Sequence, residues 1–127
     1  MDISAKISAK IRKKIEPKLE PGESLQQVFL AQSGLNPNWL LTAAYVMAFW
    51  NKYWVFAVTD RRILIFRASV WMPSAAKDLA AALPRSTRFG SVSGLWWGAL
   101  EIGGTRYWVH KKFQKDVRAA DADAPAA

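Results

Sequence analysis

The sequence has no cysteine and a single histidine, His110, among its 127 residues. The absence of cysteine excludes disulfides, zinc–thiolate sites and cysteine nucleophiles. His110 directly precedes two lysines, and no spacing of histidine and carboxylate residues suits a metal. The glycine-bearing stretches at residues 90–94 and 103–104 do not match a phosphate-binding signature. We therefore expect a protein that is not an enzyme and that uses no cofactor and no metal.

Long apolar runs are also scarce. Residues 39–50 are apolar almost throughout, but twelve residues are too few to cross a bilayer of ~30 Å as a helix. Extension to Val58 gives twenty residues with one charge, Lys52, which is long enough to span. We favour a strand over residues 53–58 instead, and leave open whether residues 39–50 are core, interface or membrane-contacting. No apolar run follows the basic N-terminal residues before Pro17, so we expect no secretory signal peptide.

What the chain has in excess is positive charge, with a formal net charge of +8. Residues 1–20 hold six basic and three acidic residues, and residues 61–90 hold six basic and one acidic. Two cationic regions favour polyanionic partners, either acidic lipid headgroups or nucleic acid. The alternative interpretation is that the excess of lysine and arginine only keeps the protein soluble.

Two hairpins are predicted in the middle and later parts of the sequence. The apolar runs at residues 53–58 and 63–66 flank a polar turn, Thr-Asp-Arg-Arg, at residues 59–62. Residues 95–102 and 105–109 flank a Gly-Gly pair that is typical of a two-residue turn. Residues 23–32 predict a first strand. Residues 77–83 fit either a helical turn or a strand that leads to Pro84.

Helices are predicted at both ends. Residues 3–16 carry isoleucine at every fourth position and lysines on or beside the opposite face. Such a helix packs on its own domain, lies on an anionic membrane or pairs with another helix. Residues 110–122 form a second amphipathic pattern, with Val109, Phe113 and Val117 on one face. We expect residues 121–127 to be a flexible tail.

The strand–turn–strand sequence YWVFAVTDRRILIF at residues 53–66 resembles the bacterial pleckstrin-homology-like (PH-like) domains. Gly22-Glu23 and the stretch WVHKKF at residues 108–113 are similar to the small actinobacterial members. The resemblance covers roughly residues 20–122. It implies a mainly β (α+β) fold, a bent seven-stranded antiparallel sandwich or barrel that a C-terminal amphipathic helix caps. We therefore divide the chain into an extra basic helix at 1–19, a PH-like domain at 20–120 and the tail.

The resemblance implies a non-enzymatic module that binds lipid headgroups or peptides. The basic loop that the phosphoinositide-binding members use would be residues 33–38 here, and it has no cation. We predict anion or headgroup binding by four arginines elsewhere: Arg61, Arg62, Arg85 and Arg88. We predict contact with a membrane or partner by two groups of residues: Ile3, Lys6, Ile7, Lys10, Ile11 and Lys13, and the tryptophans Trp39 and Trp50.

Two alternatives remain open. Seven tryptophans and eighteen basic residues suit RNA or single-stranded nucleic acid, and Arg88-Phe89 is the tight basic–aromatic pair in a loop. The second alternative is a homo-oligomer whose interface is formed by the apolar residues 39–50. The preferred prediction is a cytoplasmic protein that binds a protein partner or the inner face of the cell membrane.

Overall fold

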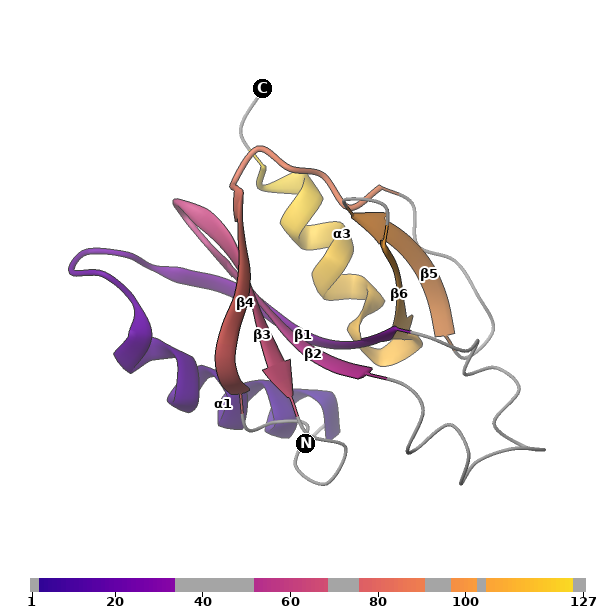
Figure 1. The fold of residues 1–127 in the computed structure, drawn as a ribbon, viewed down its shortest axis with the longest axis horizontal. Helices are drawn as coiled ribbons and strands as arrows, with labels where there is room; N and C mark the ends of the chain where they lie inside the picture. The colour runs from indigo at the N-terminus through magenta and orange to yellow at the C-terminus, as the bar shows by residue number, and fades with distance from the viewer. Residues whose placement is uncertain (1–2, 34–51, 69–75, 91–96, 103–104, 125–127) are drawn as a thin grey trace.

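The computed structural model describes residues 3–33, 52–68, 76–90, 97–102 and 105–124. Within these residues, six antiparallel strands form one sheet in the order β4-β3-β2-β1-β6-β5. The sheet curls into a half-barrel, with one helix near each end of the chain (Figure 1). The predicted mainly β fold with two flanking helices is confirmed. The described residues form six strands, whereas the family resemblance implies seven.

The strands follow the predicted hairpins closely. The first hairpin pairs β2 (Lys52–Thr59) with β3 (Arg62–Ala68), and the second pairs β5 (Trp97–Ile102) with β6 (Thr105–His110). β1 is Leu25–Ser33. Because residues 52–58 are strand, a spanning helix over 39–58 is wrong. The described part of the chain includes no helix that is long and apolar enough to cross a membrane.

The ambiguous segment before Pro84 is strand β4 (Ala76–Pro84), which pairs with β3. Its alanines favour a helix when taken alone. The exposed edge of β3 offers a ladder of backbone hydrogen bonds, and this tertiary pairing outweighs the local preference. β4 lies at one end of the sheet order, so one of its edges has no strand neighbour within the described residues.

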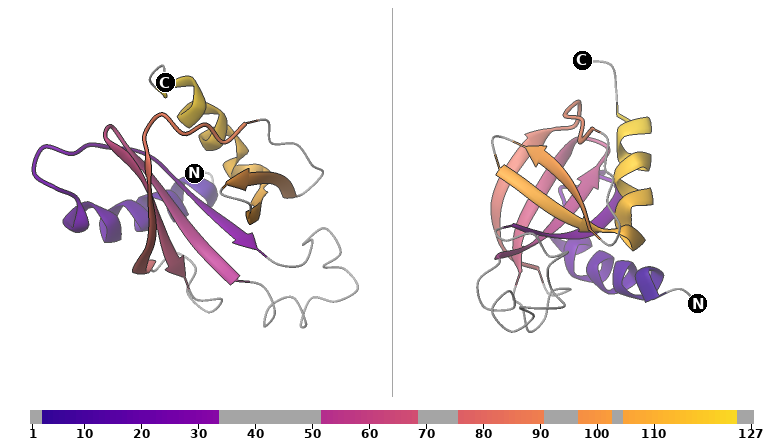
Figure 2. Two further views of the ribbon diagram at one scale, coloured as in Figure 1. Left: turned by 45° about the horizontal axis from the view of Figure 1, so that its top comes forward. Right: turned by 90° about the vertical axis from the view of Figure 1, so that its right-hand side faces the viewer.

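The two faces of the sheet are covered by different helices (Figure 2). On one face, α1 (Ile3–Ile15) packs on Val28, Val55 and Leu64, and the short helix η1 (Glu16–Lys18) follows it. On the other face, η3 (Lys111–Phe113) and α3 (Gln114–Ala122) pack on an aromatic core. A sheet buried on both faces explains why β2 is an unbroken apolar run instead of an alternating one.

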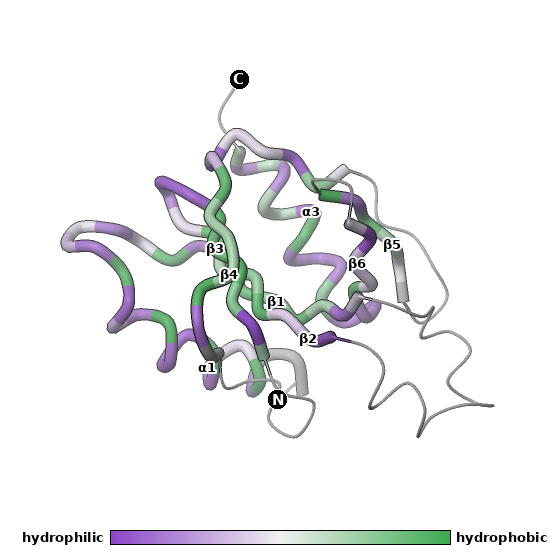
Figure 3. The backbone as a smooth tube through the Cα atoms, in the orientation of Figure 1, coloured by the Kyte–Doolittle hydropathy of each residue, from purple (hydrophilic) through white to green (hydrophobic). Residues whose placement is uncertain are grey.

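The aromatic core lies between the sheet and α3. Phe29 and Phe56 stack with ring centroids 4.9 Å apart, and Phe89 meets Phe29 edge-on at 5.4 Å. Phe113 and Val117 pack on this cluster, as the predicted face of the C-terminal helix requires. Figure 3 shows the apolar residues gathered in the central strands and alternating with polar residues along α1.

The half-barrel is open between β1 and β6, and α3 covers the opening. These strands pair only at Gln32–Trp108 and Ser33–Tyr107 among the described residues, so the first part of β1 has no strand on that side. α3 packs against β1 there, and Arg12 of α1 donates hydrogen bonds to the carbonyls of Leu25 (3.2 Å) and Gln26 (2.6 Å).

The end of α3 corrects the predicted start of the tail. Asp121 is inside the helix, which continues to Ala122. The Asp121 carboxylate accepts hydrogen bonds from the backbone N–H groups of Phe89 (2.7 Å) and Gly90 (2.8 Å). These bonds attach the 85–90 loop to the helix, and they hold Asp121 in place. Gly90 has φ +82°, a left-handed conformation that glycine adopts without strain.

Candidate functional site

The β2–β3 turn is fixed by a buried carboxylate. The Glu23 side chain is 0% exposed and accepts hydrogen bonds from Arg62 Nε and Nη2, both at 2.9 Å. Thr59 Oγ1 donates a third hydrogen bond at 2.7 Å. The hydrogen bonds from Arg62 outweigh the cost of burial and lower the pKa of Glu23 from 4.5 to about 2. Glu23 is therefore ionised under all ordinary conditions and neutralises Arg62.

The rest of the turn is bound to the same segment. Asp60 accepts a hydrogen bond from Ser24 N (2.9 Å) and donates its own backbone N–H to Ser24 O (3.0 Å). Arg61 is half-exposed and lies 3.6 Å from the Glu20 carboxylate. Of the two arginines in this turn, Arg62 stabilises the fold through its bonds to Glu23, and Arg61 faces solvent.

The other two predicted anion-binding arginines cap α3. Arg85 is 5% exposed and donates to Gln26 Oε1 (3.2 and 2.8 Å) and to the carbonyl of Ala120 (3.1 Å). Arg88 donates to the carbonyl of Asp121 at 2.8 Å. Cations at the C-terminal end of a helix satisfy its last carbonyls and oppose its dipole. The four arginines therefore do not form one open anion site, because each of them binds a group of this chain.

Of the isoleucines predicted to touch a membrane or partner, Ile7 and Ile11 are turned inward, as is Ile15 after them. Ile11 and Ile15 are fully buried against the sheet, and Ile7 is partly buried. Of the three alternatives for this helix, the structure shows packing on its own domain. The Ile3 side chain, Trp39 and Trp50 lie outside the described residues.

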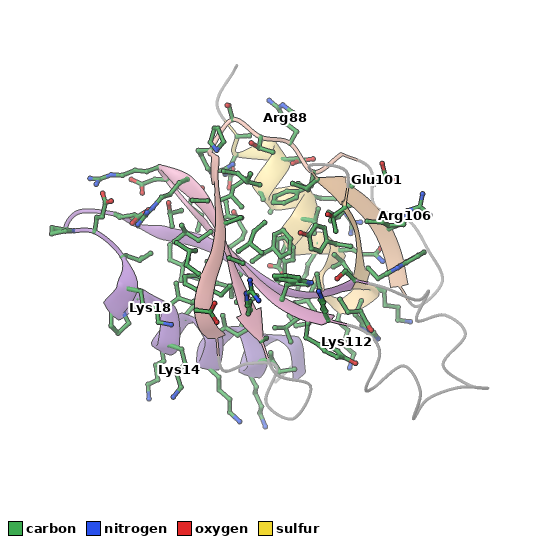
Figure 4. The ribbon with its side chains drawn as sticks, in the orientation of Figure 1. Lys14, Lys18, Arg88, Glu101, Arg106 and Lys112 are labelled. Carbon is green, nitrogen blue, oxygen red and sulfur yellow. The ribbon has the colours of Figure 1, made fainter. Side chains whose placement is uncertain are left out.

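The exposed side of α1 carries a row of lysines, of which Lys14 lies at the edge of the isoleucine stripe. Lys6, Lys10, Lys13 and Lys14 are all exposed, and within the described residues none of them forms an ion pair. At 100° per residue they share an arc of about 100°. We call these four residues the lysine face. In Figure 4, Lys14 points away from the sheet.

A groove lies beside this helix. It has a volume of about 330 Å³ and is bounded by η1, β3 and β4. Its lining residues are Lys18, Arg62, Leu64, Phe66, Asp78 and Leu79. The Lys18 ammonium lies 5.0 Å from the centroid of the Phe66 ring, and Leu79 is 49% exposed. We call it the η1–β4 groove; it combines an apolar floor with cations at its rim.

Two other features bear on the alternatives. His110 caps η3, because its Nδ1 accepts a hydrogen bond from Lys112 N (3.2 Å); burial, then Lys112 and Lys111, lower its pKa. The part of the chain that the structure describes contains no cluster of metal-ligating side chains. Phe89, the aromatic partner of Arg88 in the nucleic-acid hypothesis, is 4% exposed inside the aromatic core and cannot stack on a base.

The chain matches no family model, no curated protein and no solved structure. The fold class therefore rests on the coordinates, and membership of the PH-like family remains a prediction.

Sequence reasoning missed Glu23 and the η1–β4 groove. The available signal for Glu23 was its place just after the Pro21-Gly22 break. The Thr-Asp-Arg-Arg turn elsewhere in the chain offered arginines that could pair with it. The groove had no such signal, because it depends on how far α1 and η1 extend across the sheet.

Proposed function

We propose that this chain is a non-enzymatic, PH-like binding module that associates peripherally with an anionic membrane surface through the lysine face of α1. The observation that carries the proposal is the arrangement of α1: Ile11 and Ile15 are fully buried in the core, while four lysines are exposed without an acidic partner in the described residues. A helix held in this way presents its charge on a rigid support, so it need not order itself on binding.

The expected strength follows from the charge. A lysine close to an anionic bilayer contributes about 1 kcal/mol. Four lysines together would contribute roughly 4 kcal/mol, or about three orders of magnitude in affinity. This term decays within a Debye length of about 8 Å at physiological ionic strength, so the association is reversible and sensitive to salt.

The test is co-sedimentation with vesicles of phosphatidylcholine alone and of phosphatidylcholine mixed with phosphatidylserine. The test variant replaces the lysine face with glutamine, which has a similar helix propensity. The matched control makes four equivalent changes on the other helix and the turn before it: Lys111→Gln, Lys112→Gln, Lys115→Gln and Arg118→Gln. Both variants reduce the net charge by the same amount, and circular dichroism checks that both fold.

We expect the natural chain to bind the anionic vesicles only, the lysine-face variant to lose at least tenfold in affinity, and the control to change by a few-fold. Equal losses in the two variants would show that net charge alone governs binding and would refute the assignment to α1. Absence of vesicle binding together with salt-sensitive retention of RNA would favour the nucleic-acid alternative instead.

A further inference from the structure

The outer edge of β4 is the most open part of the described sheet. β4 is nine residues long and pairs with β3 on one side only. Residues 78–82 are exposed one after another, although they belong to a strand. At the other end of the sheet, β5 has six residues, of which Gly98 and Leu100 are buried. The two edges therefore differ, and β4 has the longer and more accessible row of backbone groups.

Natural edge strands are usually protected by charges, prolines or bulges, because their unpaired N–H and C=O groups invite another strand. In β4 the charges and the proline stand at the ends, with Lys77 and Asp78 near its start and Pro84 at its last position. Register shifts in the pairing with β3 also place one bulge at Ala80 and another between Ala76 and Leu79. The centre, residues 79–83, reads Leu-Ala-Ala-Ala-Leu and contains no charge. The alanine side chains are small, so another backbone can approach closely.

The η1–β4 groove places a side-chain pocket beside this edge. Leu79 is opposite Phe66 in the β3–β4 register, so both lie on the α1 side of the sheet, where they line the groove. A strand added outside β4 would direct every second side chain to that same side. An apolar side chain of the added strand would then contact Leu79, whose exposed half has no cover among the described residues.

The charges around β4 indicate what kind of strand fits. Lys18 stands at the groove, and Arg88 follows the end of the strand, where it also donates to the carbonyl of Asp121. Arg62 lines the groove as well, but Glu23 neutralises its charge. The acidic residue of the strand, Asp78, is paired with Arg67 at 3.4 Å. A second copy of the chain would bring two molecules of net charge +8 together, which opposes pairing of β4 with itself. An acidic segment meets no such repulsion.

We propose that the edge of β4 binds an extended acidic peptide segment of a partner protein as an additional strand, with an apolar side chain of that segment against Leu79. Main-chain hydrogen bonds supply the affinity in this mode of recognition, and the groove and its cations supply the specificity. This site does not include the lysine face, so the peptide-binding proposal can be tested independently of the membrane proposal.

The probe is a fluorescent peptide of alternating glutamate and valine, eight residues long, titrated with the full chain at low salt and followed by anisotropy. Two peptides serve as controls. The first alternates lysine and valine, which reverses the charge. The second keeps the glutamate–valine composition but alternates L- and D-residues, so it cannot form a regular strand. We expect both controls to bind at least tenfold more weakly than the probe.

Two protein variants test the position. Leu79→Asp places a carboxylate at the groove, and Leu79→Asn removes the apolar contact without adding charge; the exposure of Leu79 lets both variants fold. We expect a loss of at least tenfold for Leu79→Asp and of a few-fold for Leu79→Asn. Amide hydrogen exchange should slow at residues 76–84 on addition of the probe and stay unchanged at residues 97–102.

Three results would overturn the proposal. The first is no binding of the probe at millimolar concentration. The second is equal binding of the mixed L/D peptide, which would show that only charge is recognised. The third is concentration-dependent self-association that protects β4 without any peptide, because the edge would then belong to a second copy.

Discussion

Replacement of Glu23 by glutamine tests the electrostatics of the β2–β3 turn directly. Glutamine keeps the size of the side chain and an oxygen acceptor, but it removes the negative charge that Arg62 and Thr59 surround. Arg62, whose side chain is 28% exposed, would lose its closest counter-charge. The expected effect is a loss of stability with no change of fold.

The magnitude and its pH dependence follow from the pKa of Glu23. The folded chain lowers that pKa from 4.5 to about 2, so the ionised carboxylate stabilises the fold above pH 4.5, and this contribution is lost as the pH falls through about 2. The free energy of unfolding of Glu23→Gln should therefore be lower by roughly 2–3 kcal/mol at pH 7. The difference from the natural chain should shrink between pH 5 and pH 2.

The assay is urea denaturation of both chains at intervals from pH 2 to pH 7. The difference between the two curves isolates Glu23 from the other carboxylates, which titrate in both proteins. Glu101→Gln is the control, because Glu101 and Arg106 form an exposed cross-strand pair at 3.1 Å that should contribute less than about 0.5 kcal/mol. A Glu23→Gln difference that is below 0.5 kcal/mol at pH 7, or that does not change with pH, would refute the reasoning.

Two further predictions concern the helices. Ile11→Ala should lower the free energy of unfolding by about 2–4 kcal/mol in urea, because Ile11 is fully buried, whereas Lys10→Ala next to it should change it by less than about 0.5 kcal/mol; similar values for the two would contradict the packing of α1 on the sheet. Asp121→Ala should cost about 1–2 kcal/mol in thermal unfolding, because the backbone N–H groups of Phe89 and Gly90 lose their acceptor; an unchanged midpoint would show that the 85–90 loop is held by other contacts.

The sequence predicted most of the strands because their signals are local. The runs around the Thr-Asp-Arg-Arg turn and the Gly-Gly pair specify hairpins between neighbours in the chain, and both predicted pairs of strands are present. The sequence of β4 is ambiguous because its alanines have no strand preference of their own. Its pairing with β3 is a tertiary contact that composition does not reveal.

The candidate site was harder to predict because the type of a residue does not reveal whether its side chain is exposed or which groups it binds. Arg62 and Arg85 look alike in the sequence as free cations, yet one is bound to a buried carboxylate and the other to the end of a helix. The isoleucine stripe of α1 was recognised correctly as an apolar face, but the periodicity is the same whether a sheet or a bilayer covers it. Only the position of α1 on the sheet decides between them.

That position also determines how α1 can meet a membrane. To insert Ile11 and Ile15, the helix would have to detach from the sheet, and each fully buried isoleucine represents about 1.5–3 kcal/mol of burial. The bilayer would return about the same amount, because acyl chains are as apolar as a protein core. The sheet face under α1 would meanwhile be exposed, and the hydrogen bonds from Arg12 to β1 would be lost. Insertion therefore yields no net gain, whereas the proposed binding through the lysine face needs no detachment of the helix. The attraction of the lysine face for an anionic membrane should vanish near 1 M salt, where the Debye length is about 3 Å.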